Sequence, residues 1–147
     1  MHLLIIEDSH SDLALILHSI HDAGLDWTID SVTDGETALK YLLQRDEYAR
    51  APIPNLVILD LGLPSVSGVE VLRYIRNTVK LAHMPVVVLT ASQAQEDIVD
   101  TYNLSANCYI RKKDNMDGMV TQVRNICEFW FDKVQLPRFD TSNKAFA

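Results

Sequence analysis

The chain has 147 residues, 48% of them hydrophobic and 22% charged, which is the size and composition of one globular domain with a sizeable core. Its 13 basic and 20 acidic residues give a formal net charge of −7, which argues against a general binder of nucleic acids or anionic membranes. The first apolar run is too short for a signal peptide or a membrane span, and Cys108 and Cys127 lack the spacing of a zinc site or a disulfide framework, so we expect a cytoplasmic protein.

Strand-like and helix-like segments alternate along the chain. The strand-like segments are short and apolar, whereas the helix-like segments repeat apolar residues at a spacing of three or four. Between the second helix and the third strand, the charged segment 44–55 contains two prolines and predicts a surface loop. In chain order the pattern predicts a strand at 2–6, a helix at 11–23, a strand at 27–32, a helix at 35–43, a strand at 56–59, a helix from 68, a strand at 86–89, a helix at 95–102, a strand at 107–111 and a long helix at 115–134.

This alternation predicts an α/β domain with a parallel sheet that is covered by helices on both faces. We expect the domain to span residues 1–136 and residues 137–147 to form a C-terminal tail without a core of its own. No output domain is expected, so any output must come from the surface of the domain.

Polar residues follow the predicted strands at the edge of the sheet where ligands bind in open α/β folds. Clustered carboxylates repel one another and need a cation, and a site made only of oxygen ligands favours Mg²⁺. A hydroxyl and an ammonium at the same edge could neutralise a phosphoryl group. The residues are Glu7 and Asp8 after the first strand, Asp60 after the third, Thr90 after the fourth and Lys112 after the fifth.

Each of these residues also has a simpler interpretation when it is taken alone. Asp60 could be a turn residue, and Glu7 and Asp8 could cap the first helix and favour its dipole. His18 and His21 have the helical spacing of metal ligands, but a solvated helix face explains them better. The simpler interpretations lose weight because the motifs occur together and in order at the strand ends.

Together the motifs resemble the receiver domain of two-component response regulators over residues 2–134. The resemblance rests on Glu7-Asp8, Asp60, Pro64, Gly68, Thr90-Ala91, Tyr109 and Lys112. It implies a flavodoxin-like (βα)5 sheet of strand order 2-1-3-4-5 and a signalling protein rather than an enzyme. It further implies that Asp60 accepts a phosphoryl group from a sensor histidine kinase with Mg²⁺ as cofactor. The implied roles are Mg²⁺ binding by Glu7, Asp8, Asp60 and the Gly62 carbonyl, phosphoryl binding by Thr90 and Lys112, and switching by Tyr109 with the surface of the fourth helix, fifth strand and fifth helix.

A narrower resemblance concerns the partner kinase. The long 45–54 loop, the 107–110 strand and the aromatic end of the last helix are similar to the small response regulators that partner bacterial phytochromes. A phytochrome is therefore the expected kinase.

The loop after Lys112 departs from the family pattern. Receivers have a proline directly after this lysine, with a cis bond that aims the lysine side chain, whereas Lys113 follows it here. A cis bond before a residue other than proline costs about 3 kcal/mol, so either the loop is trans and reshaped or Lys112 is placed less rigidly. Gly62 and Ser92, two residues after Asp60 and Thr90, are small, and we expect them to leave the acyl phosphate open to water.

The last predicted helix has a wide apolar stripe with three consecutive aromatic residues. Consecutive residues point about 100° apart on a helix, so the three rings cannot all face one sheet. Either a second chain covers some of them, or the tail folds back over them with Phe139 and Phe146. We expect a homodimer whose interface includes Met119, Val123, Phe129, Trp130 and Phe131.

Three other functions match parts of the pattern. A flavin-binding electron carrier would share the fold, but Glu7 and Asp8 would repel the flavin phosphate. A phosphatase with an aspartyl-phosphate intermediate would need a second acid two residues after Asp60, where Gly62 stands. A phosphorylation-independent adaptor on a receiver scaffold is the third alternative, because Lys113 alters the loop beside the acceptor site.

Overall fold

A parallel five-stranded sheet forms the centre of the computed structural model, which describes residues 1–139. Its strand order, β2-β1-β3-β4-β5, confirms the predicted flavodoxin-like fold. The strands are β1 (His2–Ile6), β2 (Thr28–Val32), β3 (Leu56–Leu59), β4 (Val86–Thr90) and β5 (Cys108–Arg111).

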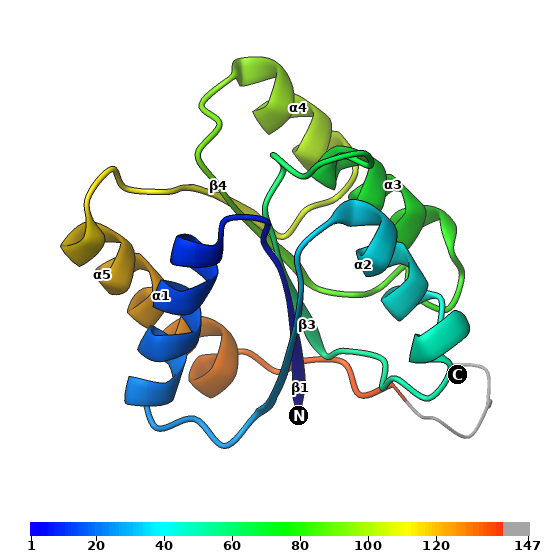
Figure 1. Cartoon of the computed structure of the whole chain (residues 1–147), viewed down its shortest axis with the longest axis horizontal. Helices are drawn as coiled ribbons and strands as arrows, with labels where there is room; N and C mark the ends of the chain where they lie inside the picture. Colours follow the sequence, from blue (N-terminus) through cyan, green and yellow to red (C-terminus); the bar gives the residue numbers. More distant parts are fainter. Residues whose placement is uncertain (140–147) are drawn as a thin grey trace.

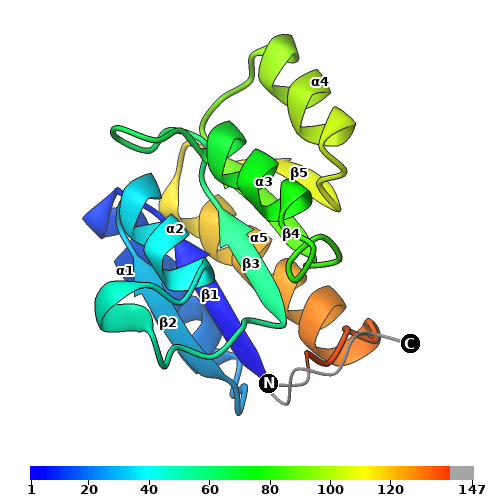
Figure 2. The same ribbon diagram turned by 90° about the vertical axis from the view of Figure 1, so that its right-hand side faces the viewer.

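Helices cover both faces of this sheet (Figure 1). On one face α1 (His10–Asp22) packs beside α5 (Met116–Cys127), and on the other lie α2 (Gly35–Leu42), α3 (Gly68–Asn77) and α4 (Gln95–Asn103). Figure 2 shows α2 and α3 in front of the sheet. A short 3₁₀ helix, Asp46–Tyr48, interrupts the predicted surface loop. Within the described residues, no helix is long and apolar enough to cross a membrane.

The three central strands are buried at every position, and their apolar side chains alternate between two buried clusters. In β1, Leu4 and Ile6 point to the α2–α3 face, whereas Leu3 and Ile5 point to the α1–α5 face. The residues of β3 and β4 alternate in the same way. A sheet covered on both faces therefore explains the continuous apolar runs in the sequence.

The last helix differs from its prediction. α5 ends at Cys127, and Glu128–Lys133 forms a π-helical turn in place of a regular helix to residue 134. Met119 and Val123 are buried in the cluster between α5, α1 and the sheet. The prediction that Met119 and Val123 form an interface is therefore wrong, because neither side chain lies on the surface of the domain. Their stripe on α5 faces the core of its own chain.

The three consecutive aromatic residues point in different directions. The ring centroid of Phe131 lies 4.4 Å from that of Trp27, the residue just before β2. Trp130 is half-buried, whereas Phe129 is 53% exposed. Contacts within the chain therefore account for Phe131, and Phe129 is left on the surface.

The first residues of the predicted tail contact the body of the domain. The side-chain amide of Asn55 donates a hydrogen bond to the Pro137 carbonyl at 3.1 Å. Phe139 packs against the cluster on the α2–α3 face, which is the face opposite α5. Phe146, the other aromatic residue expected to fold back, lies outside the described residues.

A polar network closes the amino end of the sheet. The Tyr41 hydroxyl donates to a carboxylate oxygen of Asp30 at 2.6 Å and lies 2.8 Å from Nε2 of His2. The backbone N–H of His2 donates to the side chain of Asn55 at 2.8 Å. The network links β1, β2, α2 and the segment before β3.

Candidate functional site

The five polar residues predicted at the strand ends meet at the carboxyl edge of the sheet. One carboxylate oxygen each from Glu7, Asp8 and Asp60 lies within 4.8 Å of the other two. Thr90 ends β4, and its carbonyl accepts a hydrogen bond from the backbone N–H of Lys112 at 2.8 Å. The parallel register therefore brings acids, hydroxyl and ammonium to one place, as the sequence predicted.

A cleft of about 550 Å³ opens over this group of side chains. It is lined by residues that follow β1, β3, β4 and β5, and by residues of α1, α3 and α4. Asp60, Thr90 and Lys112 are each less than 8% exposed, whereas Asp8 is exposed. These three side chains thus lie at the floor of an open cleft.

Charge and burial compete at the two buried carboxyls. Burial raises the pKa of Glu7 to about 7, although its hydrogen bond with Lys112 opposes the shift. Burial would also raise the pKa of Asp60, but hydrogen bonds with Thr90 and Glu7 and the charge of Lys112 together hold that pKa below its ordinary value. Asp60 is therefore ionised at neutral pH, as a nucleophilic carboxylate must be.

Lys112 contacts three carboxylates at once. Its Nζ lies 2.7 Å from Glu7, 2.9 Å from Asp12 and 3.1 Å from Asp60. Burial lowers the pKa of Lys112, but the hydrogen bonds and charges of these carboxylates outweigh burial and raise the pKa. The ammonium stays charged and makes one contact with each of the three acids.

Asp12 was not among the residues predicted from the sequence. It lies in the first turn of α1, where Ser9 caps the helix and accepts a hydrogen bond from the Asp12 N–H at 3.3 Å. An acid in the first helical turn is normally explained by the helix dipole. The available signal was its place in the first turn of the helix that follows β1, next to the carboxyl edge of the sheet.

The loop after Lys112 is trans, since no cis peptide bond occurs in residues 1–139. The side chain of Gln122 on α5 ties this loop down. Its oxygen accepts from the Lys113 N–H at 2.9 Å, and its amide donates to the Arg111 carbonyl at 2.6 Å. Of the two possibilities left open by the sequence, the structure shows the reshaped trans loop, with Lys112 fixed by its ion pairs.

The loop after Asp60 depends on glycine at two positions. A Cβ on Gly68 would lie 2.3 Å from the Asp60 carbonyl oxygen, so α3 can begin this close to the site only without a side chain there. Gly62 is exposed, its N–H donates to the Asp60 carboxylate at 3.2 Å, and a Cβ there would meet only the Asp60 carboxylate oxygen, at 4.0 Å. Gly62 therefore leaves the approach to Asp60 uncovered.

Tyr109 is connected to Thr90 through Ser92. The Tyr109 hydroxyl donates to the Ser92 carbonyl at 2.8 Å, and the Ser92 N–H donates to the Thr90 hydroxyl oxygen at 3.4 Å. The Ser92 hydroxyl in turn donates to the carboxylate of Asp97 in α4. These hydrogen bonds connect Thr90 with both β5 and α4.

The acidic group fits a hard divalent cation. The donors of Glu7, Asp8 and Asp60 are all oxygens, and two of the three residues are nearly inaccessible to solvent. The Lys112 ammonium already occupies the position of a cation between Glu7 and Asp60. The chemistry of these donors supports divalent metal binding.

Comparison with known proteins gives the same picture. The family model for the response regulator receiver domain matches residues 3–124. Response regulator Rcp1 of Synechocystis sp. is 38% identical over 135 residues, covering 92% of each chain.

Two solved structures are similar over nearly the whole chain. The Mn²⁺-bound form of Rcp1 superposes with a TM-score of 0.91 at 37% identity, covering 93% of this chain and 99% of that one. The phosphorylated cyanobacterial phytochrome response regulator RcpA superposes with a TM-score of 0.90 at 38% identity, covering 93% and 98%.

Proposed function

Because the chain belongs to the response regulator receiver family, we propose that Asp60 accepts a phosphoryl group from a sensor histidine kinase. The observation that supports this most directly is the buried, ionised Asp60 carboxylate with the Lys112 ammonium 3.1 Å away. A lone carboxylate at the end of an apolar strand would otherwise be costly to bury.

The transfer itself is a displacement at phosphorus. A carboxylate oxygen of Asp60 attacks the phosphorus, the bond to the kinase histidine nitrogen breaks, and that nitrogen retains the electron pair. Thr90 and Lys112 then donate hydrogen bonds to the phosphoryl oxygens. Glu7, Asp8, Asp60 and the Gly62 carbonyl would bind Mg²⁺, which supplies neutralising positive charge when it is bound.

Incubation with acetyl phosphate and Mg²⁺, followed by intact mass measurement, tests this proposal. We expect one phosphoryl adduct on the native protein and none on Asp60→Asn or in the presence of excess chelator. An equal adduct on Asp60→Asn would contradict the assignment of the acceptor. A native protein without any adduct would favour the adaptor that works without phosphorylation.

The consequence of phosphorylation is proposed to be a change at the α4–β5–α5 surface. The hydrogen bonds from Thr90 through Ser92 to Tyr109 support this, because they join the acceptor site to α4 and β5. On phosphorylation, we expect changes in backbone amide NMR shifts or in amide hydrogen exchange in α4 and β5. These changes should be lost in Tyr109→Phe.

We further propose a phytochrome as the kinase, in the cytoplasm. The support is the similarity to RcpA, which is described as a phytochrome response regulator. Phosphotransfer from a purified phytochrome kinase should be faster than from an unrelated histidine kinase. Equal rates from both would remove this part of the proposal.

A homodimer through the end of α5 is also proposed. An apolar groove of about 790 Å³ lies beside the edge strand β5, between Ile110, Ile126, Phe129 and Trp130. Phe129 is exposed at its rim, and exposed aromatic residues around an apolar groove are typical of protein contacts. Sedimentation should show a dimer that Phe129→Ser weakens. Monomer alone at high concentration, with or without phosphate, would remove the dimer.

A further inference from the structure

Asp12 contacts the ammonium of Lys112 but has no part in the acceptor chemistry described above. Of the three carboxylates around Nζ of Lys112, Glu7 and Asp60 belong to the proposed metal and acceptor set. Asp12, at 2.9 Å, is the third. A carboxylate that pairs with Lys112 and stands outside that set can hold the ammonium without competing for the same oxygens.

The position of Asp12 is fixed by the helix rather than by a mobile loop. Its backbone is in the first turn of α1, three residues after the Ser9 cap. Its side chain is 32% exposed and lines the same cleft as Asp60 and Lys112. Asp12 is thus anchored at the rim of the cleft, on the side of Lys112.

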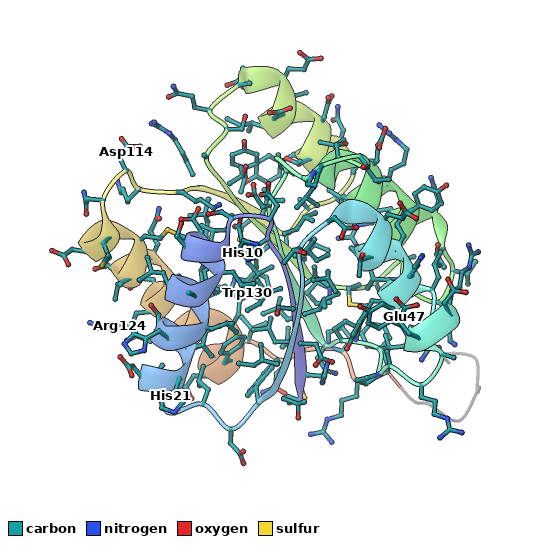
Figure 3. All side chains as sticks on the ribbon, in the orientation of Figure 1. His10, His21, Glu47, Asp114, Arg124 and Trp130 are labelled. Atoms are coloured by element: carbon teal, nitrogen blue, oxygen red, sulfur yellow. The ribbon has the colours of Figure 1, made fainter. Side chains whose placement is uncertain are left out.

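Asp114, the acid nearest to Lys112 in the chain, does not provide an equivalent contact. Asp114, two residues away, is 93% exposed and points out of the loop toward solvent (Figure 3). The Lys112 side chain itself is only 7% exposed, so an ammonium displaced from Glu7 and Asp60 would have little access to water. It needs another partner near its present position.

We propose that Asp12 is a positioning residue for Lys112, an inference that rests on the proposed function. When a divalent cation takes the oxygens of Glu7 and Asp60, charge repulsion pushes the ammonium away from them. Asp12 keeps the ammonium paired and beside Asp60, ready for the phosphoryl oxygens.

A matched pair of variants tests the inference by metal binding alone. Asp12→Asn removes the carboxylate that contacts Lys112, and Asp100→Asn removes an equal charge from the lining of the same cleft. The probe is Mn²⁺, and its binding is measured by electron paramagnetic resonance. Asp12→Asn should weaken Mn²⁺ binding about tenfold, because Lys112 then remains paired with Glu7 and Asp60. Asp100→Asn should weaken it by no more than about twofold, the effect of a distant charge.

A double-mutant cycle separates positioning from a structural role. In the Lys112→Met background, Asp12→Asn should weaken Mn²⁺ binding by no more than about twofold, because no ammonium remains to be positioned. Equal losses in both backgrounds would overturn the inference, and so would equal losses for Asp12→Asn and Asp100→Asn. Thermal unfolding of each variant shows whether it is folded, and Asp12→Ser provides a second uncharged replacement.

Phosphoryl uptake from acetyl phosphate at saturating Mg²⁺ gives the second measurement. Asp12→Asn should take up the phosphoryl group about tenfold more slowly than the native chain. The double variant Asp12→Asn/Lys112→Met should take it up no more slowly than Lys112→Met alone. If the native chain takes up no phosphoryl group, the proposed function fails, and the Mn²⁺ cycle still decides the role of Asp12. If the native chain and Asp100→Asn react alike and Asp12→Asn equals them, only the Asp12 inference fails.

Discussion

The two ends of the central sheet both bury polar side chains, but they balance charge in opposite ways. At the carboxyl end, Glu7, Asp12 and Asp60 surround one ammonium, that of Lys112. At the amino end, Tyr41 joins His2 and the Asp30 carboxylate through hydrogen bonds. One end has an excess of acids and the other is a closed hydrogen-bond network.

The difference gives a physical reason to assign the proposed reaction to the carboxyl end and a structural role to the amino end. A closed network satisfies its members, so nothing further needs to bind there. The excess of negative charge at the carboxyl end has a cost that a divalent cation can offset. Uncompensated charge, rather than burial of polar groups as such, identifies the functional end of this sheet.

The largest expected effect comes from removing the ammonium. In metal-free protein, Lys112→Met should lower the free energy of unfolding by about 3 kcal/mol, because it leaves the buried carboxylates without their partner. Mg²⁺ should restore more stability to this variant than to the native protein, since the ammonium no longer competes with the metal. Urea unfolding with chelator and with Mg²⁺ measures both quantities.

The neighbouring lysine gives the matched control for this comparison. Lys113 is exposed, so Lys113→Met should change the free energy of unfolding by less than about 0.5 kcal/mol. If Lys112→Met were as stable as Lys113→Met without metal, the buried carboxylates at the carboxyl end would not depend on the Lys112 ammonium for charge compensation.

A smaller effect is expected from opening the network at the amino end. Tyr41→Phe removes the hydroxyl that bonds to Asp30 and contacts His2, and should cost about 1 to 2 kcal/mol of unfolding free energy. Tyr48→Phe, in the neighbouring ring 5.4 Å away, is the control. Mn²⁺ affinity should be unchanged in both variants, and a loss of metal binding in Tyr41→Phe would show that the two ends are coupled.

Removal of the Asn55 side chain should lower the free energy of unfolding by about 1 kcal/mol. Asn55→Ala breaks the contacts with the His2 N–H and with the Pro137 carbonyl. Amide hydrogen exchange at His2 should become faster, while exchange in β4 and β5 stays unchanged. Unchanged exchange at His2 would mean that Asn55 does not hold this end of the sheet together.

The sequence was sufficient for the parts of the molecule that follow from periodicity and strand order. The apolar runs, with Asp60 and Thr90 at their ends, predicted the sheet and the edge where the site lies, because parallel strands all end on one side. The predicted strand order came from the family resemblance, since periodicity alone does not determine which strands are neighbours.

What the sequence did not predict depends on contacts between distant segments. Asp12 and Lys112 are 100 residues apart, and their ion pair depends on how α1 packs beside the β5–α5 loop. Met119 and Val123 were assigned to an interface because an apolar stripe on a helix does not reveal whether its own sheet or a second chain covers it. The π-helical turn after Cys127 has no local signal that separates it from a regular helix.

The smallest effect on stability, and the most specific effect on chemistry, is expected at Gly62. Because a Cβ at this position would meet only the Asp60 carboxylate oxygen at 4.0 Å, Gly62→Arg should fold with less than about 0.5 kcal/mol of change in unfolding free energy. Its long side chain should cover the approach to Asp60 and slow hydrolysis of the acyl phosphate several-fold. The decay of radiolabelled phosphoprotein after removal of acetyl phosphate measures this rate.

Gly62→Ala is the matched control, since it adds a side chain too short to cover the acceptor oxygen. It should therefore hydrolyse its phosphate at the native rate. If Gly62→Arg were also unchanged, access of water across Gly62 would not limit hydrolysis. The lifetime of the phosphate would then have to depend on groups beneath the cleft, such as Thr90 and Lys112, rather than on how open the cleft is.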